Sequence, residues 1–359
     1  MKSKHIQHLL PYQLFEATNI GFLTTRQKNF LNDCTNGSWT LNPSTNLVDI
    51  AGNFYCVNQK LDSFLGVFFG RVSGSFDCSI NNIVSLKGAP RQVKGSFICK
   101  DNELVSLKGA PLKVGKDFDC MSNKLVSLEG APQNVGRKFA CNNNKLVSLE
   151  GAPQTVEGDF NCGNNQLTTL TGAPPTVGGN FICYNNKLVS LKGAPQKVGE
   201  GFDCQKNKLV SLEGAPQEVE EGFNCSYNQL VSLKGAPQKV WGNFDCYFNH
   251  QLVSLEGAPQ KVGGKFWGIH FRLEGEKWNL RGWTQLLRNK STSPRAKKLI
   301  LTLIGPDFWN SQISAYPEDT LRKLVSLWDL LPDHIKRGIQ IPPNLVSYFE
   351  YLKKNRSSK

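Results

Sequence analysis

The eleven cysteines are the residues of this chain best suited to chemistry, because a thiolate can attack an electrophile or bind a metal ion. From Cys78 onward each cysteine follows the previous one by 21 residues, and the two earlier intervals are 22 residues. Zinc sites usually need pairs such as C-x-x-C with histidines nearby, whereas this chain has one cysteine per interval and five histidines in all. We therefore expect no metal site and no cofactor. The cysteines are Cys34, Cys56, Cys78, Cys99, Cys120, Cys141, Cys162, Cys183, Cys204, Cys225 and Cys246.

Other residue types follow the same period. A phenylalanine precedes each cysteine by two residues from Phe54 to Phe244, and an asparagine follows by three residues from Asn81 to Asn249. The unit reads F-x-C-x-x-N-x-L-V-S-L-x-G-A-P-x-x-V-x-x-x, and ten or eleven units run from about residue 52 to 266. One unit cannot bury its apolar side chains alone, so stacking of successive units into a solenoid is the structure that this repeat predicts.

Each part of the unit has a local interpretation. Phenylalanine and cysteine, two residues apart, point to the same face of a short strand, and the asparagine after them can bond backbone groups of a turn. The two leucines of L-V-S-L point inward again, and G-A-P interrupts regular structure because proline lacks an N–H. Strands stacked in register would place neighbouring cysteines about 4.8 Å apart, side by side, which is a poor geometry for a disulfide. The cysteines are therefore predicted to be reduced and buried, as in a reducing compartment.

The unit F-x-C-x-x-N-x-L-x-x-L resembles the leucine-rich repeat pattern L-x-L-x-x-N-x-L, with phenylalanine and cysteine in two leucine positions. The short period, with proline closing a helix-free convex side, is similar to bacterial effector-type leucine-rich repeats. The string G-A-P-x-x-V-x-G-x-F-x-C also resembles tandem-repeat proteins of tailed phages and giant viruses. The resemblance covers roughly residues 38–266. It implies a binding scaffold with parallel strands on a concave face and extended segments behind them. The reduced cysteines predict that the protein acts in a cytoplasm, that of the host cell if the protein is viral.

The chain divides into three expected parts. Residues 1–51 contain a predicted helix, TTRQKNFLNDC, and a predicted hairpin that turns at NPST, and we expect them to form an N-terminal cap. Residues 52–266 form the solenoid, and residues 267–359 have the patterns of three to five short helices, as a domain or a second cap. Residues 265–359 hold 17 basic and 8 acidic residues, a net charge of +9 of the +13 of the whole chain. No secretory signal and no membrane span are expected, because no apolar run is long enough.

No catalytic motif is evident in the sequence. Some effector-type leucine-rich repeat proteins carry a C-terminal cysteine-dependent ligase domain, but no cysteine follows Cys246 here. We therefore expect a protein that is not an enzyme. An alternative role is nucleic-acid association through the basic residues 281–298, which include the string RGWTQLLRNKSTSPRAKK.

Large aromatic residues mark the expected binding site. The outward positions beside phenylalanine and cysteine are mostly small, acidic or polar, whereas aromatics gather in the last few units. Tyrosine and tryptophan are frequent anchors of protein interfaces. The sequence therefore predicts a protein partner, of unknown identity, bound on the concave face. A second interpretation is that the C-terminal segment covers the same rings. The predicted partner-binding residues are Tyr184, Tyr227, Trp241, Tyr247 and Phe248.

Overall fold

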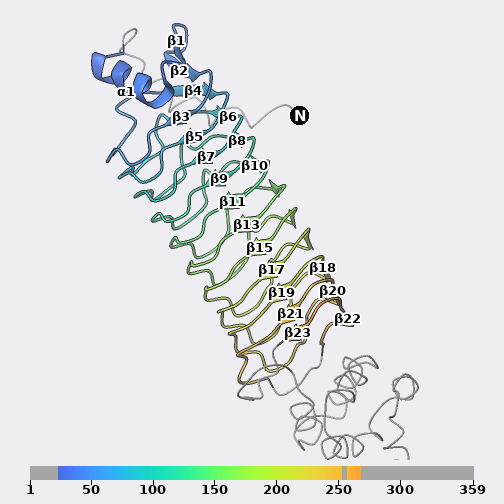
Figure 1. Ribbon diagram of the computed structural model, residues 1–359. Coiled ribbons are helices and arrows are strands. Elements are labelled where there is room, and N and C mark those ends of the chain that lie inside the picture. Colours follow the sequence, from blue (N-terminus) through green and yellow to red (C-terminus); the bar gives the residue numbers. More distant parts are fainter. Residues whose placement is uncertain (1–22, 253–256, 268–359) are drawn as a thin grey trace, which may run out of the picture.

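The computed structural model describes residues 23–252 and 257–267, and the remaining residues lie outside the description that follows. The described chain is a column of stacked turns, most of them 21 residues long, with two short strands in each turn (Figure 1). In this view the line of strands from β3 to β23 is almost straight. The fold is a leucine-rich-repeat-like β-solenoid, as the period predicts. The interpretation of residues 267–359 as helical falls almost entirely outside the described residues.

One parallel sheet contains the phenylalanine of every turn. Each phenylalanine pairs with the phenylalanine of the next turn, for example Phe139 with Phe160, so the strands stack without any offset. This register follows from the constant period, because each turn meets an equivalent segment in the next. The 11 strands are β3 (Phe54–Tyr55), β5 (Phe76–Asp77), β7 (Phe97–Ile98), β9 (Phe118–Asp119), β11 (Phe139–Ala140), β13 (Phe160–Asn161), β15 (Phe181–Ile182), β17 (Phe202–Asp203), β19 (Phe223–Asn224), β21 (Phe244–Asp245) and β23 (Phe266–Trp267).

A second row of strands runs along the other side of each turn, where the sequence predicts only extended segments. From β6 onward its members end at the valine that follows G-A-P, and Val135 for example pairs with Val156. The same constant period explains this second row, because any segment that is extended in one turn meets an equally extended segment in the next. A 9-stranded sheet and a 3-stranded sheet make up the row: β1 (Trp39–Asn42), β2 (Leu47–Ile50), β4 (Phe69–Val72), β6 (Gln92–Val93), β8 (Lys113–Val114), β10 (Asn134–Val135), β12 (Thr155–Val156), β14 (Thr176–Val177) and β16 (Lys197–Val198), then β18 (Glu218–Val219), β20 (Lys239–Val240) and β22 (Lys261–Val262).

The core between the two rows is a set of columns of identical side chains. The phenylalanine rings stack nearly parallel in most turns, as Phe76 and Phe97 do with centroids 5.4 Å apart and planes 9° apart, and the planes of Phe181 and Phe202 are tilted by 37°. The cysteines, the two leucines and the valines are buried beside them in nearly every turn. The glycine of G-A-P allows the chain to close each turn, since Gly172 has φ +90° and a Cβ there would lie 2.5 Å from the backbone of Leu149.

The N-terminal end of the column is covered by a helix and a hairpin, in agreement with the sequence prediction. Helix α1 (Thr25–Thr35) begins at a capping box formed by Thr24 and Gln27. The helix places Phe30 edge-on against Phe54, with ring centroids 5.6 Å apart, and so shields the first ring of the stack. The antiparallel hairpin β1–β2 extends the second row of strands at the same end. Within residues 23–252 and 257–267, no helix is long and apolar enough to cross a membrane.

Candidate functional site

The cysteine column places its thiols in the core. All eleven cysteines are buried and unbridged. Several thiols donate to a backbone carbonyl of the next turn, as Cys120 Sγ does to the oxygen of Ala140 at 3.3 Å and Cys204 Sγ to that of Asn224 at 3.3 Å. Burial raises the pKa of the Cys120 and Cys204 thiols well above the ordinary value. In the part of the chain that the structure describes, no group of three or more His, Cys, Asp or Glu is placed to hold a metal ion.

The buried asparagines tie each turn to the one before it. In one representative turn, the Asn144 amide nitrogen donates to the carbonyl oxygens of Cys120, Cys141 and Asn142 at 3.1, 3.1 and 3.3 Å. Its amide oxygen accepts the backbone N–H of Leu125 at 3.0 Å. The sequence predicts the bonds within the turn, and the structure adds those to the preceding turn. These side chains stabilise the solenoid and are not available to a ligand.

The residue just before each of these asparagines has an unusual backbone. At nine successive turns its φ lies between 52° and 57°, in the left-handed region that disfavours most side chains. Asp and Asn tolerate this region best, yet Ile80, Tyr227 and Phe248 also adopt it. The sequence interpretation places these side chains on the strand face, but the strands end earlier and these residues belong to the turn. The positions are Ile80, Asp101, Ser122, Asn143, Asn164, Asn185, Lys206, Tyr227 and Phe248.

The turn geometry brings three of the predicted site residues together at the C-terminal end of the 11-stranded sheet. The rings of Tyr227 and Phe248 stack with centroids 4.2 Å apart and planes 15° apart. The Tyr247 ring lies 6.2 Å from that of Phe248 and 6.1 Å from that of Trp267. Tyr227 and Phe248 are 45% and 38% exposed. We call Tyr227, Tyr247, Phe248 and Trp267 the aromatic cluster.

Two basic side chains lie over the rings of the aromatic cluster. Lys206 Nζ is 5.8 Å from the centroid of the Tyr227 ring, and Lys265 Nζ is 5.1 Å from that of Trp267. Trp267, absent from the sequence prediction, occupies the outward position of the last described strand. The rule that the residue after each phenylalanine points outward could have identified it. The cluster is thus a partly exposed π surface with positive charge at its edge.

The other two predicted site residues have different neighbours. Tyr184 lies over the preceding turn, where its hydroxyl accepts from Asn164 Nδ2 at 3.0 Å and its ring occupies the space that a Cβ on Gly163 would need. Trp241 follows strand β20 in the second row, and Lys261 Nζ lies 3.8 Å from its ring centroid. The five predicted residues therefore do not form one continuous site.

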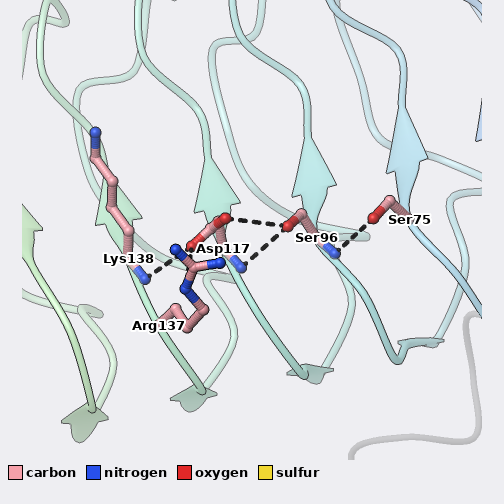
Figure 2. A network of polar contacts seen from close by, with 5 residues as sticks. All are labelled: Ser75, Ser96, Asp117, Arg137 and Lys138. Carbon is pink, nitrogen blue, oxygen red and sulfur yellow. Dashed lines mark hydrogen bonds and ion pairs between the residues drawn. The ribbon is translucent and has the colours of Figure 1, made fainter.

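A polar network crosses several turns at the position before each phenylalanine. Figure 2 shows the Ser96 hydroxyl donating to the Asp117 carboxylate, while Ser75 Oγ accepts the backbone N–H of Ser96. Asp117 also accepts the backbone N–H of Lys138 and lies 3.7 Å from Arg137 Nε. These contacts link four successive turns, so their simplest role is to stabilise the stacking of the turns at this position.

Comparison with known proteins adds little to this description. No family model matches the sequence, and no curated protein matches it. Among solved structures, YopM from Yersinia enterocolitica WA-314 is similar over 71% of this chain and 76% of that chain, with 14% sequence identity and a TM-score of 0.33. At that identity and score, the similarity supports no inference about function.

Proposed function

We propose that this chain is a non-catalytic scaffold that binds a protein partner through the aromatic cluster at the C-terminal end of the 11-stranded sheet. The observation that carries the proposal is the stack of Tyr227 on Phe248, two aromatic side chains in left-handed backbone that remain partly exposed. Clusters of exposed rings commonly serve as interface anchors. The buried, neutral thiols favour a non-catalytic role and a reducing compartment such as a cytoplasm.

The choice of residues at these two positions supports a role outside the fold. A left-handed backbone costs a non-glycine residue about 1–2 kcal/mol, and Asn is one of the residues that tolerate it best. This chain itself has Asn at Asn143, Asn164 and Asn185 in equivalent turns. Tyr227 and Phe248 are therefore poorer choices for local stability. A partner that stacks on the rings would compensate for that loss.

The test uses the chain's own alternative residue. A double variant Tyr227→Asn and Phe248→Asn removes the stack without introducing a residue that the left-handed turn disfavours. The control is Ile80→Asn, the same change at the equivalent position near the N-terminal end. Proteins bound by each full-length variant from cells that express the natural protein are then identified by mass spectrometry, together with the melting temperature of each variant.

We expect a partner that the parent and Ile80→Asn retain and the double variant loses, with the melting temperature of the double variant unchanged or raised. Retention of every partner by the double variant contradicts the proposal. So does a fall of several degrees in its melting temperature, which would mean that the rings pack inside the fold, as when the C-terminal segment covers them. The nucleic-acid alternative rests on residues 281–298, which lie outside the described residues.

A further inference from the structure

An exposed apolar column runs along the solenoid on a surface that the proposed function does not use. It consists of the second residue of the L-V-S-L string of each unit, which reads I-V-S-L at residues 83–86 and L-T-T-L at residues 167–170, and each valine in it is between 46% and 58% exposed. Neighbouring members are one turn apart, so the column is about 34 Å long at the usual strand spacing. Its members, which we call the valine column, are Val84, Val105, Val126, Val147, Thr168, Val189, Val210 and Val231.

The valine column and the serine or threonine after each member stay nearly constant, while the residues two positions before the column change. All eight members are β-branched, and the one departure, Thr168, has nearly the shape of valine. The exposed position two residues earlier is Asn, Glu, Lys or Gln in different turns, so the repeats have diverged on this surface. A line of exposed apolar side chains, interrupted only by the Thr168 hydroxyl, on a diverged polar surface is typical of an interaction site.

Charged flanks border the valine column on both sides. The preceding flank lies two residues before each member and includes Glu103, Lys124, Lys145, Lys187 and Lys208. The following flank lies three residues after each member and includes Lys108, Glu129, Glu150, Lys192 and Glu213. Ion pairs link neighbours within a flank, as between Lys108 and Glu129 at 3.1 Å and between Lys124 and Glu103, and show that flank residues one turn apart lie next to each other.

We propose that two copies of this chain associate face to face through the valine column, parallel and in register. A two-fold axis along the column places the preceding flank of one copy over the following flank of the other. Within a turn, Lys145 of one copy then faces Glu150 of the other. Opposite charges meet in four turns and like charges in one, where Lys187 faces Lys192. The opposite-charge turns are those of Glu103 with Lys108, Lys124 with Glu129, Lys145 with Glu150, and Lys208 with Glu213.

The antiparallel arrangement is less complementary. A two-fold axis perpendicular to the column places each flank of one copy over the same flank of the other copy. Lys124 of one copy would then face Lys187 of the other. Centred on the same eight turns, this arrangement gives three opposite-charge pairings and two like-charge pairings. Because opposite charges across an interface fix its register and exclude other arrangements, the flanks favour the parallel pair.

The size of the surface suits a weak, reversible dimer. The chain bends at each member of the column from Val105 onward, so the five residue steps from one flank to the other span less than the ~16 Å of an extended strand, and the pair buries less than about 1,100 Å² in total. Specific interfaces usually bury about 1,200–2,000 Å² in total. We therefore expect association in the micromolar range, with complementary charges deciding which surfaces meet.

Sedimentation velocity of the full chain across a concentration series, with four variants, tests the proposal. Val147→Asp puts a charge into the middle of the column and should abolish the dimer. Lys145→Glu and Glu150→Lys should each weaken it about tenfold, since each replaces two opposite-charge pairs by like-charge pairs. The double variant Lys145→Glu with Glu150→Lys should restore the parental affinity within about twofold, because the two residues face each other only in the parallel, in-register pair.

Melting temperatures of the same variants serve as the folding control, and Lys113→Glu, an exposed change on strand β8 of the second row, serves as the charge control. A chain that stays monomeric up to about 100 µM contradicts the proposal. The valine column would then either bind another protein or only favour an extended backbone at these positions. A dimer that Val147→Asp leaves intact also contradicts it. A double variant as weak as the two single variants excludes the parallel register.

Discussion

Two adjacent columns of the same turn have opposite properties. The asparagines that include Asn144 are buried, and their amides bond the backbone of two turns. The residues immediately before them, Asn143 in this turn, have a left-handed backbone at every turn from Ile80 to Phe248 and yet differ in type. The backbone conformation is thus imposed by the stack in both columns. Residue identity is constant where the side chain bonds the backbone and free to vary where it faces solvent.

The largest expected difference in stability is between two alanine substitutions, one in each of these two columns. Asn144→Ala leaves the N–H of Leu125 and several buried carbonyls without the side-chain amide, so it should lower the free energy of unfolding by about 3–5 kcal/mol. Asn143→Ala, one residue earlier, should cost about 1 kcal/mol, because it loses the preference for a left-handed backbone and only one exposed hydrogen bond, from Asn143 Nδ2 to Ser122 Oγ at 3.5 Å. Urea titration followed by circular dichroism measures both. Equal losses would remove the distinction between the two columns.

The buried thiols should react with thiol reagents far more slowly in the native protein than in the denatured protein. Because burial raises the pKa of thiols such as Cys99 and Cys141 and excludes reagents, native protein should react at least about a thousandfold more slowly than denatured protein at pH 8. All eleven thiols should titrate after denaturation. Cys34 should react first, since it lies at the capped end and its hydrogen bond with Cys56 lowers its pKa. Rapid native labelling of a central cysteine would contradict the buried column.

A smaller effect of opposite sign is expected where a residue type fits the left-handed backbone poorly. Ile80 is β-branched and 48% exposed, with φ 56°. Ile80→Asn should therefore stabilise the fold by about 1 kcal/mol, and the converse change Asp101→Ile should destabilise it by a similar amount. Differential scanning calorimetry on both variants provides the measurement. A loss of stability in Ile80→Asn would show that the isoleucine packs against the core after all.

The smallest effect concerns the outward position between phenylalanine and cysteine. Burial raises the pKa of the Asp119 carboxyl, which accepts the backbone N–H of Met121 at 3.0 Å. Asn161 makes the same bond to Gly163 at 3.0 Å without a charge. The folded protein keeps the Asp119 proton to a higher pH than the unfolded chain, so its carboxyl lowers stability as pH rises through the folded pKa. Asp119→Asn should therefore gain stability relative to the parent between pH 4 and pH 7, as measured by the melting temperature. A difference in melting temperature between Asp119→Asn and the parent that stays constant from pH 4 to pH 7 would contradict this account.

The sequence by itself determined the solenoid, its period and its inward residues. A fixed 21-residue repeat forces equivalent residues into columns, so Phe160, Cys162 and Leu167 had to share a core with their counterparts in neighbouring turns. The capping helix and the hairpin were also predictable, since both rest on contacts between residues close in the chain. Local patterns suffice wherever the contacting residues are close in sequence or exactly one period apart.

Only the tertiary structure decided how the outward side chains are grouped. The second row of strands arises because segments ending at residues such as Val135 meet their equivalents in register, although each segment has only two strand residues. Trp267 belongs to the aromatic cluster, in which the left-handed turn directs the ring of Phe248 toward Tyr227. Trp241 lies outside the cluster because it follows a strand of the second row. These groupings depend on backbone dihedrals and on the path of each turn around the core, and neither is encoded in spacing alone.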